Sequence, residues 1–116
     1  MCCVDDRIQE AAGQFVRTRF SPHFFWYAMP GGALAVNEHG ALLLPALQVA
    51  VARGIKRIAL INHTGCAAFP SFADQQEELQ AHRNSLLNAR ALLQQEFPGI
   101  EVACVLLRGP WQVEEV

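Results

Sequence analysis

The chain has 116 residues, of which 52% are apolar and 17% charged, a composition that excludes a disordered chain and leaves room for one folded domain. Nine basic residues stand against eleven acidic ones without a basic run, so nucleic acid is not an expected partner. The richest apolar stretch, residues 41–52, is interrupted by Pro45 and Gln48 and is too short to cross a bilayer. Asp5 and Asp6 stand where a secretory signal would need basic and apolar residues. We therefore expect a single domain over residues 1–116 that is cytoplasmic and has no membrane partner.

Before residue 30, two apolar segments are predicted to be strands, with a helix between them. Residues 1–4 predict a very short strand. In residues 8–19, apolar side chains recur at the 3.6-residue period of a helix. Residues 24–28 are aromatic and apolar throughout, which predicts a strand buried on both faces. The turn that follows, Pro30-Gly31-Gly32, contains two residues without side chains, so its backbone can approach another segment closely.

A second helix and strand are predicted in the middle of the chain. Residues 42–53 predict a helix, and Pro45 fits it only within the first turn, where its missing N–H has no partner to lose. Gly54 stands at the position that commonly ends such a helix. Residues 55–62 contain Ile-Ala-Leu-Ile and predict the clearest buried strand of the chain.

The last third of the chain predicts a long helix and a final strand. Residues 71–74, Ser-Phe-Ala-Asp, have the capping-box pattern. The helix they open is expected to end near Glu96, with a leucine stripe formed by Leu79, Leu86 and Leu93. Residues 100–107 predict the last strand. Strands that alternate with helices indicate an α/β domain with a mainly parallel β-sheet flanked by helices, in which sites lie at the carboxyl ends of strands.

Two short motifs follow predicted strands. The first is C-x-D-x-R, formed by Cys3, Asp5 and Arg7, and the second is H-x-x-C, formed by His63 and Cys66. Two thiolates and an imidazole are ligands that zinc prefers, and three ligands leave a fourth position for a water that can ionise near neutral pH. In an extended chain Asp5 and Arg7 point to the same side as Cys3. The carboxylate can then accept the proton of that water, while the guanidinium keeps the carboxylate ionised.

The two motifs, and the order of the segments between them, resemble the β-class carbonic anhydrases from Cys3 to about residue 107. The resemblance implies a β-carbonic anhydrase-like domain with Zn²⁺ as cofactor and Cys3, His63 and Cys66 as its ligands. It implies reversible hydration of carbon dioxide to bicarbonate by a zinc-bound hydroxide, with Asp5 and Arg7 as the catalytic pair. The protein would then be a carbonate dehydratase, a zinc lyase.

The expected assembly is a homodimer or a higher homo-oligomer. Residues 24–27 and 42–52 offer more apolar surface than one small sheet with few helices can cover. Symmetric homodimers are the commonest way to cover such a surface, and the resemblance also implies a dimer as the minimal unit.

Other interpretations remain open at this stage. Carbonyl sulfide and carbon disulfide hydrolases resemble the same family, and a zinc-binding or bicarbonate-responsive protein without catalysis is a further alternative. Adjacent Cys2 and Cys3 would allow a thiol redox protein, although a vicinal pair is a poor substitute for C-x-x-C. In a purely structural interpretation, the motif residues are two buried thiols, a core histidine and an Asp5–Arg7 ion pair. Asp6 is the expected helix cap. The remaining candidates are assigned to core or solvated positions: Cys104, His23, His39 and His82.

Overall fold

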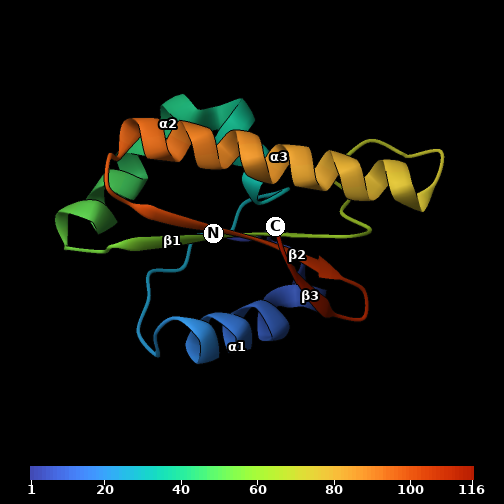
Figure 1. The fold of residues 1–116 in the computed structure, drawn as a ribbon, viewed down its shortest axis with the longest axis horizontal. Helices are drawn as coiled ribbons and strands as arrows, with labels where there is room; N and C mark the ends of the chain where they lie inside the picture. Colours follow the sequence, from blue (N-terminus) through green and yellow to red (C-terminus); the bar gives the residue numbers. More distant parts are fainter.

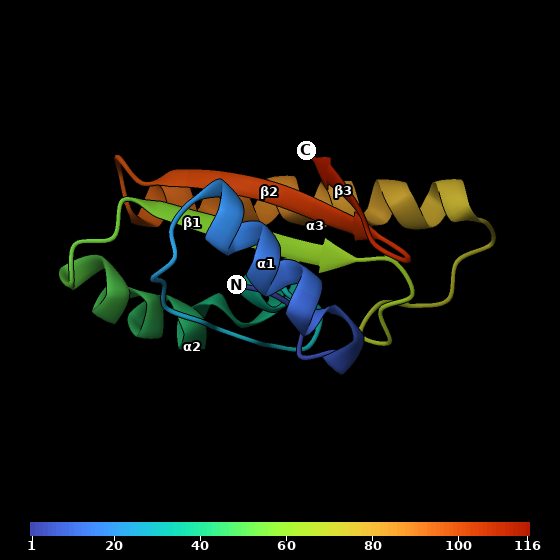
Figure 2. The same cartoon turned by 90° about the horizontal axis from the view of Figure 1, so that it is seen from below.

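The computed structural model describes all residues 1–116 and places helices on both faces of a small sheet (Figure 1). Helices α2 (Ala33–Ala52) and α3 (Gln75–Glu96) cover one face. Helix α1 (Gln9–Arg19), preceded by the 3-10 turn η1 (Asp6–Ile8), covers the other face, and Figure 2 shows it crossing the sheet. The helix predicted for residues 8–19 is therefore confirmed, and the helix predicted from the Ser71 capping box to about Glu96 is confirmed in type but starts later than predicted.

The sheet is mixed. Strands β1 (Arg57–His63), β2 (Glu101–Arg108) and β3 (Gln112–Glu115) lie in the order β1-β2-β3. β1 and β2 are parallel, whereas β2 and β3 are antiparallel. The expectation of a mainly parallel sheet was wrong, and β3 was not predicted. Only residues 109–111 separate β2 from β3, and so short a connection can form a hairpin but cannot hold the crossover that parallel strands need.

The beginning of the chain extends the sheet beyond β1. Cys2 is bridged in parallel to Ala28 on one side and to Ile61 of β1 on the other. The amide of Ile61 donates a hydrogen bond to the carbonyl of Met1 at 2.9 Å. The strand predicted for residues 1–4 is thus reduced to single bridges, which still place Cys3 beside the carboxyl half of β1.

The strand predicted for residues 24–28 is wrong. Of this segment only Ala28 is bridged, and Phe24, Phe25 and Trp26 are exposed. The segment lies at the outer edge of the sheet, where no further strand pairs with it. Its aromatic residues are therefore half covered rather than buried on both faces.

The two central strands bury both of their faces. Alternate residues of β1 and β2 pack against α2 and α3, among them Leu60, Cys104 and Leu106. The other residues pack against α1, among them Ile61, Val105 and Leu107. This double burial explains the continuous apolar runs in these strands. The leucine stripe of α3 is confirmed, since its three leucines are buried in the first of these clusters.

Helix α2 consists of two helical stretches joined by a kink at His39. The second stretch, residues 40–52, corresponds to the predicted helix over residues 42–53, and the first stretch, which begins at Ala33, was not predicted. The backbone is non-helical at His39 (φ −125°, ψ 28°), and Pro45 lies in the helix interior rather than in its first turn. No local side chain caps the helix. Instead, the Oδ1 atom of Asn62, 29 residues away, accepts the amide hydrogen of Ala33 at 2.9 Å. A start fixed by a distant residue leaves no signal in the local sequence.

The capping box of α3 is displaced by three residues from its predicted place. Asp74 Oδ1 accepts the amide of Glu77 at 2.8 Å, and Glu77 Oε2 accepts the amide of Ala73 at 2.6 Å. The box is therefore Asp74-x-x-Glu77, and the prediction that Ser71 opens the helix was wrong. The predicted end at Glu96 is confirmed.

One helix, α2, is long and apolar enough to cross a membrane by length and composition. The expectation that this apolar stretch is too short to cross a bilayer was therefore wrong, because the helix begins at Ala33 and has 20 residues. Buried core helices and N-terminal signal sequences pass the same test, and 28% of the apolar part of α2 is buried in the domain. The absence of a membrane partner stays a prediction.

Candidate metal centre

Three side chains with soft or borderline ligand atoms meet at the carboxyl end of β1. Cys3 follows the bridge at Cys2, His63 is the last residue of β1, and Cys66 lies in the loop after it. Their ligand atoms all lie within 4.8 Å of one another, and the two Sγ atoms are 3.7 Å apart without a disulfide. All three residues are buried. The structure thus brings together the three ligands named from the sequence.

The imidazole of His63 is oriented for coordination. Its Nδ1 lies 2.9 Å from the carbonyl oxygen of Thr64, which accepts a hydrogen bond from it. The proton therefore belongs on Nδ1, and Nε2 carries the free lone pair. Nε2 is buried and has no hydrogen-bond partner in the protein. A buried nitrogen lone pair that accepts no hydrogen bond and lies beside two thiols is expected of a histidine that coordinates a metal ion.

Burial favours the uncharged forms of Cys66 and His63 in the metal-free protein. It raises the pKa of the Cys66 thiol and lowers the pKa of the His63 imidazole. The amide of Gly31 donates a hydrogen bond to the Sγ atom of Cys3 at 3.4 Å. A divalent cation would supply the charge that makes a thiolate favourable in this pocket.

An Asp5–Arg7 ion pair lies beside the cluster. The guanidinium contacts both carboxylate oxygens, with Arg7 Nε 2.9 Å from Asp5 Oδ1 and Arg7 Nη2 against Asp5 Oδ2. These hydrogen bonds lower the pKa of Asp5 to about 2. Asp5 Oδ2 lies 3.8 Å from the free Nε2 of His63. An ionised carboxylate therefore faces the open side of the imidazole.

Asp5 also begins η1, which corrects the expectation that Asp6 would be the cap. Asp5 Oδ1 accepts the amide of Arg7 at 3.0 Å, whereas Asp6 is exposed within the turn. The chain is therefore not extended from Cys3 to Arg7. The tight turn folds the Arg7 side chain back onto the Asp5 carboxylate, and this contact is made by a turn rather than by strand alternation.

The peptide that precedes Cys66 is held from both sides. Arg7 Nη2 donates to the carbonyl of Gly65 at 3.1 Å, and Glu78 Oε1 of α3 accepts the amide of Gly65 at 2.6 Å. Gly65 has a φ of +69°, a conformation that favours glycine. Glu78 was missed as a site residue, because nothing in its local sequence indicates contact with a loop thirteen residues earlier.

On the face of β1 opposite to His63, Asn62 contacts His82 of α3, and His82 lies close to Glu78. Asn62 Nδ2 lies 3.5 Å from His82 Nδ1, and His82 Nε2 lies 3.7 Å from Glu78 Oε1. The His82 ring is fully buried against Phe69, with ring centroids 4.2 Å apart, and burial lowers its pKa. The i, i+4 spacing of Glu78 and His82 was the available signal for this contact, and the structural role expected of His82 agrees with its burial.

The other candidates lie apart from the cluster. Cys2 is buried with its Sγ atom 3.8 Å from Gln9 Oε1, and Cys104 is buried in the core with its thiol directed at the carbonyl of Leu86. His23 and His39 are exposed, as expected. Neither of the remaining cysteines belongs to the group of potential ligands.

The buried Cys3–His63–Cys66 group could hold a metal ion. Two thiols, one imidazole with a free Nε2 and a carboxylate on the fourth side form a donor set that suits Zn²⁺. Comparison of the chain with protein-family models, with curated proteins and with solved structures finds no match. The geometry of these residues and their sequence motifs therefore carry what can be inferred about function.

Proposed function

We propose that this protein is a zinc-dependent carbonic anhydrase of the β class, which interconverts carbon dioxide and bicarbonate. The observation that carries the proposal is the buried Cys3–His63–Cys66 cluster, whose free His63 Nε2 lies 3.8 Å from Asp5 Oδ2. The resemblance of the two sequence motifs to this family supports it. So does the position of the ligands, because Cys3 follows the parallel bridge at Cys2 and His63 is the last residue of the neighbouring strand β1.

The proposed mechanism gives each residue of the site one task. Cys3, His63 and Cys66 would hold Zn²⁺, which supplies a Lewis acid that makes water acidic near neutral pH. Asp5 would accept a hydrogen bond from the reacting water and so orient it, since its low pKa keeps the carboxylate ionised throughout the physiological range. Arg7 would position Asp5 by two hydrogen bonds and, through the carbonyl of Gly65, the loop that carries Cys66.

Stopped-flow hydration of carbon dioxide by the zinc-loaded protein tests the proposal. We expect a rate at least about a hundredfold above that of Cys66→Ser, which loses a ligand. Cys104→Ser is the matched control, because Cys104 is also a buried thiol but lies outside the cluster. A zinc-loaded protein no faster than Cys66→Ser would overturn the proposal and leave a zinc-binding protein without catalysis. Carbonyl sulfide and carbon disulfide, assayed in parallel, would identify the related hydrolases.

The proposal includes a homodimer as the minimal unit. Large apolar side chains remain exposed on α2, with Leu42 72% and Val49 59% accessible, and Phe25 at the sheet edge is 47% accessible. Such surfaces are usually covered by a second copy of the chain.

A further inference from the structure

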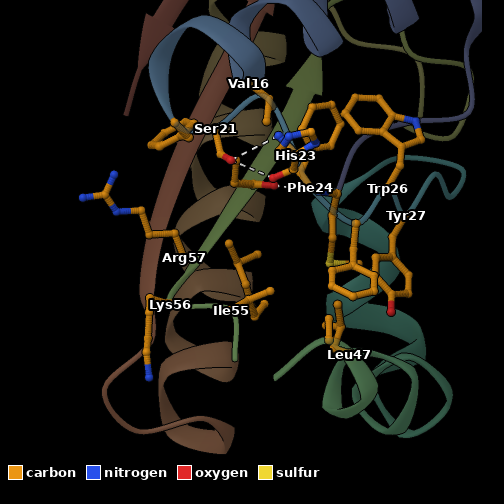
Figure 3. A pocket seen from close by; sticks show the side chains of 16 residues that line it. Val16, Ser21, His23, Phe24, Trp26, Tyr27, Leu47, Ile55, Lys56 and Arg57 are labelled. Atoms are coloured by element: carbon orange, nitrogen blue, oxygen red, sulfur yellow. Dashed lines mark hydrogen bonds between the residues drawn. The ribbon is translucent and has the colours of Figure 1, made fainter. Parts of the chain in front are cut away.

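A cavity of about 300 Å³ lies at the end of the sheet opposite to the metal cluster. It is formed where β1 begins, between residues 20–27 and the carboxyl half of α2 (Figure 3). The metal ligand His63 stands at the other end of β1. The six residue steps from Arg57 to His63 correspond to about 20 Å at the rise of a strand. No member of the metal cluster lines the cavity.

The walls of the cavity are apolar and held in place. Twelve of its sixteen lining residues are hydrophobic, and the buried side chains of Leu47 and Ile58 form part of them. Tyr27 Oη donates to the carbonyl of Ala46 at 2.9 Å, and Trp26 Nε1 donates to Gln9 Oε1 at 3.2 Å. Because the polar ends of both rings are satisfied elsewhere, their apolar surfaces are available to a ligand. Pockets that bind small molecules are largely preformed in this way.

Two cationic residues line the cavity where β1 begins, and their charged ends are directed away from the other lining side chains (Figure 3). Lys56 and Arg57 lie across the cavity from Trp26 and Tyr27 (Figure 3), and no aspartate or glutamate lines it. Arg57 Nε is 2.9 Å from Glu101 Oε2, so its charge is partly compensated. Lys56 forms no ion pair in the structure. An apolar cavity with an uncompensated cation at its rim is complementary to a molecule with a hydrocarbon body and a negatively charged end.

We propose that this cavity binds a small amphipathic monocarboxylate, with its hydrocarbon part between Trp26 and Leu47 and its carboxylate at Lys56. The volume limits the size of the ligand. At about 30 Å³ for each small group in a liquid, 300 Å³ accommodates about ten non-hydrogen atoms, the size of octanoate. The site is separate from the metal cluster in ligand, residues and position, although Phe25, which lines it, also belongs to the apolar surface proposed for the dimer.

Titration with sodium octanoate tests the proposal. Isothermal calorimetry should show saturable binding of one octanoate for each chain, with a dissociation constant of about 0.1–1 mM, the range expected of a ligand with ten non-hydrogen atoms. The chain has two tryptophans, so Trp111→Phe leaves Trp26 as the only one. The fluorescence of Trp26 should then change with the same midpoint as the heat, which places the ligand in this cavity.

Variants at the mouth test the charge and the cavity separately. Lys56→Gln should weaken octanoate binding by about two- to fivefold, as the loss of one exposed ion pair predicts. Arg53→Gln is the matched control, because it removes the same charge from an exposed position outside the cavity and should leave binding unchanged. Ile55→Phe, which enlarges a lining side chain, should lower affinity by more than about tenfold. Octan-1-ol should bind more weakly than octanoate, and octylamine more weakly still.

Three outcomes would overturn the proposal. The first is the absence of saturable heat at 5 mM octanoate, about five times the upper expected dissociation constant. The second is an equal loss of affinity in Lys56→Gln and Arg53→Gln, which would mean general charge attraction. The third is octanoate binding only as the dimer dissociates in sedimentation, which would assign this surface to a second copy of the chain. Carbon dioxide hydration should be the same in Lys56→Gln and the unchanged protein, whichever way the binding result falls.

Discussion

The Asp5 carboxylate accepts hydrogen bonds from the guanidinium of Arg7 and also lies beside the unprotonated Nε2 of His63. Asp5→Asn preserves the shape of the side chain but removes the charge and the strong acceptor. We expect zinc content to remain stoichiometric and carbon dioxide hydration to fall by about a hundredfold, an effect typical of a misplaced reacting group. Metal analysis and stopped-flow rates on one preparation measure both quantities.

Asp6→Asn is the control for this change, because Asp6 is the exposed neighbour in the same turn. Its rate should equal that of the unchanged protein. If Asp5→Asn keeps the full rate, Asp5 has no part in orienting the reacting water. If it loses zinc, Asp5 belongs to the metal-binding group instead.

Glu78 acts at a distance from the cluster, through the Gly65 peptide. Its carboxylate accepts the Gly65 amide at 2.6 Å and so fixes the backbone from which Cys66 projects. Glu78→Ala should lower zinc affinity by about 10–100-fold, the usual effect of removing a group that orients a ligand. Competition with a chromophoric chelator measures the affinity. Glu96→Ala, at the exposed end of the same helix, should have no effect, and equal affinities for the two variants would contradict this role for Glu78.

The shifted pKa values of Cys66 and His63 lead to a prediction of how zinc affinity depends on pH. Burial raises the pKa of Cys66, so the free protein holds a thiol at neutral pH and must lose its proton to bind metal. Burial lowers the pKa of His63, which is therefore already neutral above its usual titration range and loses no proton there. Affinity should rise with pH from 6.5 to 8.5, by about tenfold per pH unit for each proton displaced. Chelator competition at several pH values tests this, and a flat profile would contradict it.

At the scale of the elements, the loop after Cys66 ends at the N-cap of α3. Asp74 caps the helix through the amide of Glu77. Asp74→Ala should lower the free energy of unfolding by about 1 kcal/mol, the typical value for loss of an N-cap side chain. Denaturant unfolding of the metal-free protein measures it. Ser71→Ala removes the residue that the sequence pattern indicated as the cap and should be nearly neutral. The reverse order of effects would show that the helix starts at Ser71 in solution.

Helix α2 and the sheet edge show how tertiary contacts override local preference. Pro45 would be expected to begin a helix, yet α2 continues on both sides of it. The backbone departs from helical geometry at His39, and the amino end of the helix is capped by Asn62 of β1. A Cβ atom at Gly32 would lie 2.7 Å from the carbonyl oxygen of Ile61, so only glycine allows this approach of helix to strand. The same Asn62 side chain contacts His82 on α3, so one amide joins both helices to the end of β1.

At the scale of the whole molecule, the metal cluster joins segments about sixty residues apart in sequence, and the exposed apolar faces indicate a partner. Sedimentation at micromolar concentration should show a dimer, twice the mass of the 12.8-kDa chain. Val49→Glu should raise the dissociation constant of the dimer by at least about a hundredfold, because it places a charge in an apolar interface. Leu92→Glu on α3 is the control and should leave the dimer intact. A stable and fully active monomer would contradict the proposed assembly.

The sequence alone identified the three residues that meet at the candidate metal site and most of the regular elements, because both depend on short-range patterns. Helical periodicity identified α1 and α3, and continuous apolar runs identified β1 and β2. The motif residues Cys3, His63 and Cys66 could be placed together because carboxyl ends of parallel strands meet at one edge of a sheet. The grouping is confirmed by the structure, while zinc and the reaction stay predictions.

Only the tertiary structure decided the features that depend on residues far apart in the chain. The early start of α2 needs Asn62, the position of Cys66 needs Glu78, and the exposure of residues 24–26 follows from the missing neighbour strand. The sheet is mixed because only three residues connect β2 to β3, and so short a connection allows only an antiparallel hairpin. The length of the connection, not the composition of the strands, sets this orientation. Periodicity records which face of an element is buried, but it does not record which distant group satisfies a given amide or covers a given edge.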